Sequence, residues 1–505
     1  MSVTLGKKAD RVPPVVVGQT VEIGIDRLGY RGEGVGRVEG FTVFVEGALP
    51  GELVSARVAV VARTFAQAVL LQVKTAAAER VAPPCPVFDL CGGCQLQHLS
   101  YEAQLVWKRQ AIVDALVRIG HFQAADVAAQ VAQTLGMDDP WRYRNHVQVA
   151  AADRGGQFVA GFVEEGTHEP VEAAECLIRP HSHDDLLTRS LAIIEALGLE
   201  GYDEATGSGD IRSLAIRTNQ TGEALVVIRT VGETLPHSAE LARRLAASSL
   251  PSGIRVVGVV QVAPRSPSGQ SIWGRDTLDE VIMGLSFQVS ATSFLQVNPS
   301  QTQVLYETAL AAAQLRPDDT LWDIYCGIGT LTLLAAQHVR RAIGVEEVAA
   351  AVLDARHNAQ INGLEQTEFR VGRAERVVRE LLVDASAKGK PVSVDSAGGP
   401  AVNAEAVVGG IAVGEDAVRG GSLPDVVLLD PPRAGCAPEV IAAIADARPE
   451  RIVYLSCNPA TLARDLRLLV DRGYALKTVQ PIDMFPQTAH VECYVSLVRG
   501  CLHTK

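Results

Sequence analysis

Residues 320–330 read Thr-Leu-Trp-Asp-Ile-Tyr-Cys-Gly-Ile-Gly-Thr, an apolar run that ends in a turn with two glycines. The run Thr320–Tyr325 predicts a buried strand, and Leu331–Ala336 predicts the start of a helix. A second predicted strand, Ala342–Val345, ends at Glu346. Strand, glycine turn and helix in this order predict an α/β fold with a Rossmann-like, doubly wound sheet. Such sheets bind ligands at the carboxyl ends of their strands.

The glycine turn and Glu346 together predict a cofactor site. Gly327 and Gly329 let the backbone approach a bound group, and an acidic residue ending the next strand can accept hydrogen bonds from ribose hydroxyls. The turn lacks the last glycine of the dinucleotide fingerprint. An adenosine-type cofactor is therefore favoured over one with a pyrophosphate, and S-adenosylmethionine is the natural candidate. The alternative is a tight turn beside a surface glutamate.

Two further predicted strands lead into residues that can carry chemistry. Val426–Leu429 is followed by Asp430-Pro431-Pro432-Arg433, and Ile452–Leu455 is followed by Ser456-Cys457-Asn458-Pro459. A thiol at a strand end in the crevice can act as a nucleophile if its pKa is lowered or a proton acceptor is close. The alternatives are a plain turn at Asp430 and an inert, buried thiol at Cys457.

The last predicted strand, Val491–Val498, follows a polar segment that begins at Asp483. Either Glu492 or His490 can supply a general base to the crevice. The pattern leaves the choice between them open, and ordinary polar residues of a turn and strand face are the alternative.

The cysteines form one close group and one remote partner. Cys85, Cys91 and Cys94 have the spacing C-x5-C-x2-C, and Cys176 follows much later in the chain. Three close thiolates and a remote one suit a four-cysteine metal centre. Zinc sites more often use two C-x2-C pairs, so the spacing favours an iron–sulfur cluster and keeps zinc as the alternative.

The N-terminal part predicts a small β-barrel. Short strands between glycines over residues 16–75 predict antiparallel pairing, behind a flexible polar tail at 1–15. Arg27, Arg31 and Arg37 of this barrel either contact phosphate or are solvated surface.

The rest of the chain predicts two more domains. Residues 76–290 predict an α+β domain, with an amphipathic helix from Tyr101 to about Ile119. The apolar stripe of this helix is expected to face the core and consists of Leu105, Ile112, Leu116 and Ile119. Residues 291–505 hold the doubly wound domain. Within it, 384–424 has no aromatic residue and is expected to be a disordered insertion.

Composition indicates an ordinary globular protein. The 505 residues are 47% hydrophobic and 21% charged, and 46 Lys and Arg against 58 Asp and Glu give a formal net charge of −12. No stretch reaches about 18 uncharged apolar residues, which argues against a membrane span. The first residues lack the apolar core of a secretory signal. We therefore expect a cytoplasmic monomer whose nine cysteines are not a disulfide framework.

Six motifs, in this order, resemble those of one family. They are Cys85 with Cys91-Gly92-Gly93-Cys94 and Gln97-His98; Ser293-Phe294-Leu295-Gln296-Val297-Asn298; Asp323-Ile324-Tyr325-Cys326-Gly327-Ile328-Gly329; Asp430-Pro431-Pro432-Arg433; Ser456-Cys457-Asn458-Pro459; and Asp483-Met484-Phe485-Pro486 with His490 and Glu492. Over residues 16–500 the chain resembles the bacterial S-adenosylmethionine-dependent RNA 5-methyluridine methyltransferases. It is similar in particular to the 23S ribosomal RNA enzymes with a TRAM domain and an iron–sulfur cluster.

The resemblance implies a role for each motif. It makes the barrel a TRAM module, an RNA-binding fold of OB type. It implies Cys457 as nucleophile and Glu492 as the base. The remaining implied sites are cofactor-binding and base-positioning roles for Gln296, Tyr325, Glu346 and Asp430, and a [4Fe-4S] cluster on Cys85, Cys91, Cys94 and Cys176. No ligand is expected at Arg373, where the family carries Asn or Asp.

The implied reaction follows from the chemistry of uracil. Carbon 5 is a weak nucleophile, and addition of the Cys457 thiolate to carbon 6 creates an enolate that can attack a sulfonium methyl group. Glu492 then removes the proton from carbon 5. The target uridine has to leave its stack first.

Three functions stay open: methylation of 23S ribosomal RNA, the same chemistry on transfer RNA, and RNA binding without catalysis. The presence of both Cys457 and Glu492 argues against the third, since a binding protein needs neither.

Overall fold

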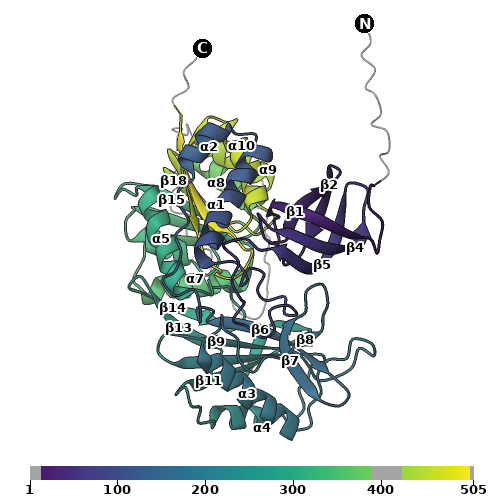
Figure 1. Cartoon of the computed structure of the whole chain (residues 1–505). Helices are drawn as coiled ribbons and strands as arrows, with labels where there is room; N and C mark the ends of the chain where they lie inside the picture. Colours follow the sequence, from purple (N-terminus) through teal and green to yellow (C-terminus); the bar gives the residue numbers. More distant parts are fainter. Residues whose placement is uncertain (1–12, 389–422, 501–505) are drawn as a thin grey trace.

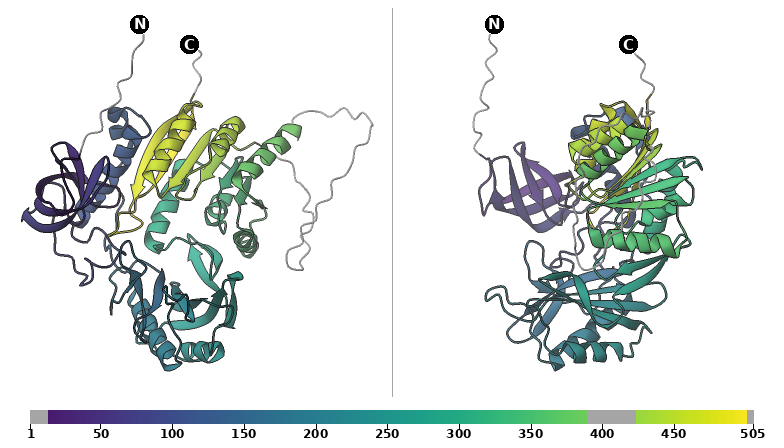
Figure 2. Two further views of the ribbon diagram at one scale, coloured as in Figure 1. Left: turned by 90° about the vertical axis from the view of Figure 1, so that its right-hand side faces the viewer. Right: turned by 180° about the vertical axis from the view of Figure 1, so that it is seen from behind.

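The computed structural model describes residues 13–388 and 423–500, which build three main β structures (Figure 1, Figure 2). The first is a closed barrel with the strand order β1-β2-β3-β5-β4. Its strands are β1 (Thr20–Leu28), β2 (Gly34–Val38), β3 (Phe41–Val45), β4 (Leu53–Val61) and β5 (Phe65–Thr75). Val15 is 2% exposed and lies in the barrel core, so the expected tail at 1–15 extends too far. Residues 1–12 lie outside the described residues.

Strand β2 is the strand of this barrel that the sequence patterns did not predict, because the glycines at 32–36 indicated a turn. Gly36 instead lies inside the strand, where a Cβ would overlap the carbonyl oxygen of Gly24 on β1. The glycine therefore serves a close approach of two backbones rather than a turn.

The second structure is a mixed sheet with the strand order β12-β11-β10-β9-β6-β7-β8. Its strands are β6 (His146–Asp153), β7 (Phe158–Val163), β8 (Pro170–Val171), β9 (Ile211–Thr218), β10 (Glu223–Thr230), β11 (Arg255–Ala263) and β12 (Ser266–Gly274). The helices α3 (His181–Ala196) and α4 (Ser238–Ala246) share an apolar core with it.

The third structure is a seven-stranded sheet with the order β17-β16-β15-β18-β19-β21-β20. Its strands are β15 (Thr320–Ile324), β16 (Arg341–Glu346), β17 (Thr367–Val371), β18 (Val426–Leu429), β19 (Arg451–Ser456), β20 (Tyr474–Ile482) and β21 (Glu492–Arg499). All pairings are parallel except those of β21, which runs antiparallel to β19 and β20. The predicted strands of the doubly wound sheet are confirmed within one residue at each end.

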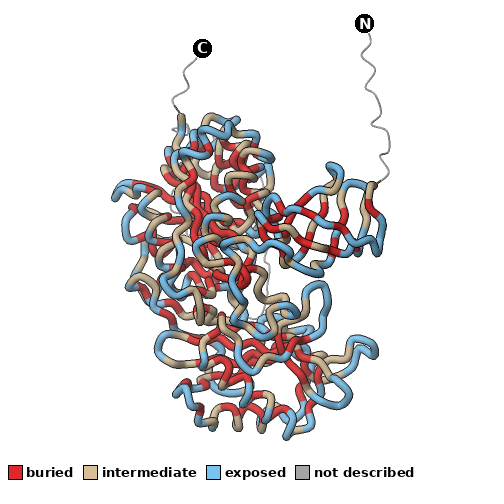
Figure 3. The backbone as a smooth tube through the Cα atoms, in the orientation of Figure 1, coloured by how far each residue is buried: buried red, intermediate tan, exposed pale blue. Residues whose placement is uncertain are grey.

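Helices cover both faces of this sheet and enclose two apolar cores. Buried backbone, drawn in red, runs through this part of the molecule (Figure 3). The helices are α5 (Pro299–Ala313), α6 (Thr330–Ala336), α7 (Ala349–Ile361), α8 (Ala374–Lys388), α9 (Pro438–Ala447) and α10 (Pro459–Val470). Residues of α5, α6 and α7 share one core, and residues of α8, α9 and α10 share the other. The sheet is therefore buried on both faces, as its near-continuous apolar strands require.

Part of the expected central domain at 76–290 packs on this third sheet instead. Helix α1 (Tyr101–Arg118) lies beside α10, and α2 (Ala124–Gln130) follows it (Figure 1). Leu135 then pairs with Ile482 at the edge strand β20. The hairpin of β13 (Thr277–Ile282) and β14 (Leu285–Ser290) packs against α7. Only the middle of the segment belongs to the central sheet.

The start of helix α1 is confirmed at Tyr101, but its buried face differs from the predicted apolar stripe. Ile112 and Leu116 are buried as expected, whereas Ile119 is 45% exposed. Two polar residues of the helix are buried instead, Gln104 at 1% exposure and Lys108 at 0%. This face of the helix therefore meets polar partners.

Helix α8 runs through the first five residues of the expected insertion at 384–424, which corrects its start. Residues 389–422 lie outside the described residues. Among the helices that are described, none is long and apolar enough to cross a membrane.

Candidate active site and cysteine centre

Strand pairing brings four predicted site residues to one edge of the third sheet. Tyr325 follows β15, Glu346 ends β16, Asp430 follows β18 and Cys457 follows β19. Strand β15 pairs with β16 and β18, and β18 pairs with β19, all in parallel. The carboxyl ends of these strands therefore lie side by side in the order Glu346, Tyr325, Asp430, Cys457.

The glycine turn and Glu346 meet directly. Glu346 Oε2 accepts a hydrogen bond from the Gly327 amide at 3.1 Å, and Oε1 accepts one from the Val348 amide at 2.9 Å. Gly327 and Gly329 both have positive φ, 56° and 80°. Tyr325 has a φ of 73°, a conformation unusual for a bulky side chain. The carboxylate of Glu346 is thus held at the turn and keeps free lone pairs for ribose hydroxyls.

The proposed nucleophile and base lie across one strand pair. Ser456 is opposite Cys493 in the antiparallel pairing of β19 and β21. The next position outward therefore sets Cys457 opposite Glu492. Glu492 is 4% exposed, whereas Cys457 is half-buried.

These groups share one electrostatic environment. Burial raises the pKa of the Cys457 thiol to about 11; the charges of Glu492 and Asp430 add to the increase, and Arg433 opposes it. Burial and the charge of Asp430 raise the pKa of Glu492 well above its ordinary value. Burial also raises the pKa of Asp430 to about 6. The crevice therefore favours neutral, protonated groups until a substrate or cation enters.

His490, the other candidate base, occupies a different position. It is exposed, and its Nδ1 lies 3.4 Å from an Arg433 guanidinium nitrogen. Its ring packs edge-on against Phe485, with 5.7 Å between the ring centroids. Of the two candidates that the pattern left open, Glu492 is the one opposite Cys457.

The loop that precedes Glu492, residues 483–490, is held by distant parts of the chain. Gln104 of α1 and Gln487 exchange two hydrogen bonds, from Gln104 Nε2 to Gln487 Oε1 at 2.9 Å and from Gln487 N to Gln104 Oε1 at 3.0 Å. The amides of Gln95 and Leu96 both donate to the Gln487 carbonyl at 3.0 Å. The Tyr143 hydroxyl donates to the Pro486 carbonyl at 3.0 Å. Sequence patterns missed these contacts; the only signal was a glutamine on the buried face of a helix.

Gln296 lies in a segment that reaches the same loop. It is 8% exposed and precedes Asn298, whose Oδ1 accepts a hydrogen bond from the Gln301 amide at the start of α5. Asn298 Nδ2 donates to the Met484 carbonyl at 3.0 Å. The structure thus ties the segment of Gln296 to the 483–490 loop.

Comparison with known proteins agrees with this geometry. Residues 14–71 match the TRAM domain, and residues 422–500 match the tRNA (Uracil-5-)-methyltransferase family. An uncharacterized RNA methyltransferase of Halalkalibacterium halodurans is 39% identical over 487 residues, which are 95% of this chain and 97% of that protein. One of Listeria innocua is 37% identical with the same coverage.

The chain belongs to the RNA (uracil-5-)-methyltransferase family. A solved structure of a Pyrococcus abyssi tRNA (uracil-54, C5)-methyltransferase with S-adenosyl-L-homocysteine has the same fold, with a TM-score of 0.66. It is 24% identical and covers 95% of this chain and 100% of its own.

The four candidate metal ligands of the methyltransferase line one cavity. Cys85, Cys91 and Cys94 face Cys176 there, and all four are half-buried free thiols. Burial raises the pKa of Cys94 to about 12, and the other three thiols add to that increase. Thiols that raise one another's pKa in a buried cavity are stabilised by a shared cation, which fits a thiolate-bound centre.

The spacing of these sulfurs tests the two metals that the sequence left open. Among the described residues, no three of the cysteine sulfurs lie within 4.8 Å of one another. A tetrahedral zinc with Zn–S bonds of about 2.3 Å brings its sulfurs to within about 3.8 Å. In this structure the cysteine sulfurs are therefore spaced more widely than a closed tetrahedral zinc site requires.

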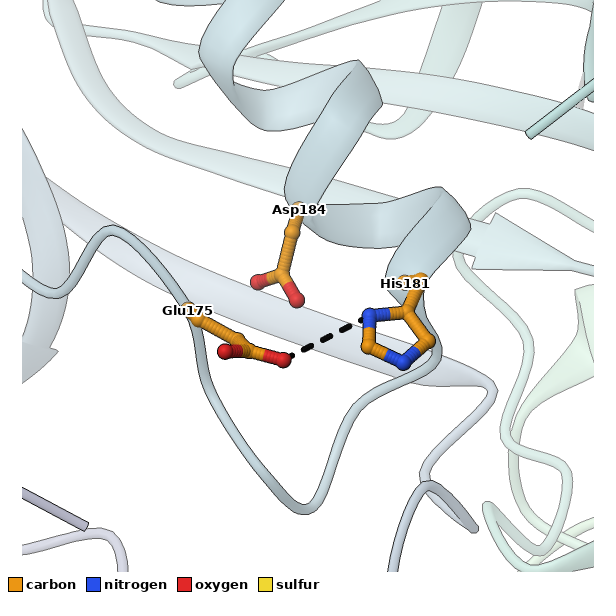
Figure 4. Close-up of side chains that lie close together, drawn as sticks. All are labelled: Glu175, His181 and Asp184. Atoms are coloured by element: carbon orange, nitrogen blue, oxygen red, sulfur yellow. Dashed lines mark ion pairs between the residues drawn. The ribbon is translucent and has the colours of Figure 1, made fainter. Parts of the chain in front are cut away.

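A neighbouring cluster of Glu175, His181 and Asp184 does group its ligand atoms closely (Figure 4). Arg179 Nε, however, lies 2.5 Å from Asp184 Oδ1, and Arg142 pairs with both carboxylates. Asp184 also accepts a hydrogen bond from the amide of residue 176 at 3.2 Å. The arginines neutralise this cluster, which holds the backbone of the fourth cysteine in place.

Proposed function

We propose that this methyltransferase transfers a methyl group from S-adenosylmethionine to carbon 5 of a specific uridine in 23S ribosomal RNA. The observation that carries the proposal is the register of β19 and β21, in which Ser456 lies opposite Cys493, so that the next position sets Cys457 opposite Glu492, beside Asp430. A thiol and a carboxyl on neighbouring strands can reach carbon 6 and carbon 5 of one uracil ring.

The residues act in sequence. The Cys457 thiolate adds to carbon 6 of the flipped uracil, which makes carbon 5 nucleophilic. S-adenosylmethionine supplies the methyl group that carbon 5 takes up. Glu492 accepts the proton from carbon 5, and the carbon–sulfur bond then breaks to return the Cys457 thiolate. Arg433 stabilises the thiolate, because its charge lowers the pKa of Cys457.

Gln296, Tyr325, Glu346 and Asp430 act on cofactor and base without joining the proton transfers. Glu346 binds the ribose of the cofactor from the glycine turn. Tyr325 lies next to it and borders the cofactor. Asp430 and Gln296 orient the uracil, which can hydrogen-bond to a carboxyl and an amide.

Cys85, Cys91, Cys94 and Cys176 hold a [4Fe-4S] cluster in this proposal. Methyl transfer has no redox step, so the cluster is structural. The residues directly after Cys94 donate hydrogen bonds to the 483–490 loop. A cluster that orders the cysteine segment therefore also orders the approach to Glu492.

Ribosomal RNA is proposed as substrate because the chain carries both the four-cysteine cavity and the TRAM barrel. Transfer RNA is the second candidate, since the solved structure with the same fold is named as a transfer RNA enzyme.

One experiment tests reaction and substrate together. Protein purified anaerobically is incubated with S-adenosylmethionine and unmodified transcripts of 23S ribosomal RNA or transfer RNA, and nucleosides are identified by mass spectrometry. We expect 5-methyluridine in ribosomal RNA, none with Cys457→Ala, and wild-type yield with the control Cys501→Ser. 5-Methyluridine in transfer RNA alone would show that transfer RNA, and not 23S ribosomal RNA, is the substrate. Equal RNA binding with no 5-methyluridine in either RNA would support a binding protein without catalysis.

A further inference from the structure

The barrel carries a rigid turn between β1 and β2 that points toward the active site. The Gly29 amide donates to the Glu33 carbonyl at 2.7 Å, and the Gly32 amide donates to the Gly29 carbonyl at 3.2 Å. The Arg31 amide donates to Glu33 Oε2 at 2.8 Å. These bonds close the turn, and Tyr30 at its tip is 56% exposed.

This turn packs between the cysteine segment, the 483–490 loop and the central part of the chain. Gly32 has a φ of 88°, and a Cβ there would lie 3.1 Å from Leu96 and 3.4 Å from both Gln95 and Ala489. Ala489 belongs to the loop that leads into Glu492. The side chain of Arg31 forms an ion pair with Glu165 of the central part. The barrel, the cysteine segment and the catalytic loop therefore meet at the base of Tyr30.

Tyr30 lies within electrostatic reach of the nucleophile. Burial raises the pKa of its phenol; the charge of Arg433 opposes this increase and that of Cys457 adds to it. Within the described part of the chain, its ring has no stacking partner and its hydroxyl no hydrogen bond. A partly exposed aromatic ring on this turn thus has neither a stacking partner nor a hydrogen bond among the described residues.

The charges around Tyr30 differ between its two sides. Toward α1, Tyr30 borders a groove that is also lined by Trp107, four carboxylates and two arginines: Asp26, Glu79, Glu102, Asp114, Arg27 and Arg118. That side repels phosphate. Toward the crevice, the exposed residues are Arg433, which is a cation, and His490, which can form hydrogen bonds. The charges therefore favour a phosphate backbone on the crevice side of Tyr30.

We propose that Tyr30 stacks on a nucleobase of the RNA substrate that adjoins the flipped target uridine, so that the barrel completes the active site. The inference rests on the proposed function, since a flipped base is what the Cys457 chemistry requires. Flipping leaves neighbouring bases unstacked, at a cost of a few kcal/mol. An aromatic side chain that covers one exposed base face recovers part of that cost for any base.

The test measures binding, so that it does not depend on turnover. In a Cys457→Ala background, Tyr30→Ala, Tyr30→Phe and the control Trp273→Ala are titrated against transcripts of 23S ribosomal RNA and transfer RNA. Trp273 is an aromatic residue of β12 that is 40% exposed. We expect Tyr30→Ala to weaken binding of the substrate RNA about 5- to 100-fold. Tyr30→Phe and Trp273→Ala should stay within about twofold. The slope of log K against log salt should not change, since stacking releases no counterions.

A second readout locates the contact. Ultraviolet cross-linking of the Cys457→Ala protein to RNA, followed by peptide mass spectrometry, should give a nucleotide adduct on Tyr30. Binding by Tyr30→Ala within twofold of its parent, or a loss shared by Tyr30→Phe, would overturn the stacking contact. The proposed reaction fails separately, if protein with Cys457 intact makes no 5-methyluridine while Tyr30→Ala still weakens RNA binding.

Discussion

Lys108 Nζ of helix α1 lies 2.5 Å from Asp483 Oδ1, and both side chains are fully enclosed by protein. Lys108 also donates to the Phe485 carbonyl at 3.0 Å. The pair joins a helix that precedes the central sheet to the loop that leads into Glu492. A buried ion pair of this kind fixes geometry more than it adds stability, because desolvation offsets most of the attraction.

Breaking this pair should damage both stability and catalysis. Lys108→Met leaves the Asp483 carboxylate buried and unpaired, and we expect a loss of about 3–5 kcal/mol in the free energy of unfolding. The double variant Lys108→Met with Asp483→Leu should recover much of that stability but not the methylation rate, since the loop loses its anchor. Urea unfolding and single-turnover methylation measure the two effects.

The matched control is Arg118→Met. Arg118 pairs with Asp114 at 3.1 Å on the exposed side of the same helix. Removing it should cost at most about 1 kcal/mol. Full activity in the double variant would show that the ion pair does not position the loop.

Glu492→Gln should separate methyl transfer from proton removal. Glutamine cannot accept the proton from carbon 5, so the methylated uracil should stay bound to Cys457. We expect a denaturation-resistant RNA–protein adduct and a product yield lower by about 10²–10⁴-fold. His490→Ala should keep activity within a few-fold, because His490 is exposed and precedes the strand position that lies opposite Cys457. An adduct with His490→Ala but not with Glu492→Gln would reverse the two roles.

Methylation should become faster as pH rises. The folded protein holds the pKa of Cys457 near 11 and that of Glu492 well above its ordinary value, both through burial first. Both groups must be deprotonated to act, so single-turnover rates should increase from pH 6 to pH 9. Arg433→Ala removes the charge that lowers the pKa of Cys457 and should move the profile to higher pH. A profile that is flat over this range would contradict a rate-limiting thiolate.

Loss of one cysteine ligand should remove the cluster. Cys94→Ser, purified anaerobically, should lose its iron and the visible absorbance of an iron–sulfur cluster, and it should melt at lower temperature. Cys501→Ser should keep both signals. Zinc in place of iron in the wild-type protein would contradict the proposed iron–sulfur cluster. An unchanged iron content in Cys94→Ser would show that Cys94 is not a ligand.

Local patterns were sufficient for five of the seven strands of the catalytic sheet and for grouping the crevice residues. A parallel sheet places strand ends at one edge, so Glu346, Asp430 and Cys457 could be grouped from sequence alone. The start of helix α1 at Tyr101 also followed from its periodicity. Strand β2 was missed, because Gly36 serves a close backbone approach that looks like a turn in sequence.

The amino-acid sequence by itself determined which residues end strands, where the helices begin, and which chemistry a thiol, a carboxyl and four cysteines can support. Only the tertiary structure decided that α1 packs on the catalytic sheet, that Gln104 meets Gln487, and that Tyr30 of the barrel lies near Cys457. The physical reason is the distance along the chain over which each signal acts. Periodicity records which face of an element is buried, whereas contacts between residues hundreds of positions apart depend on how the finished domains pack.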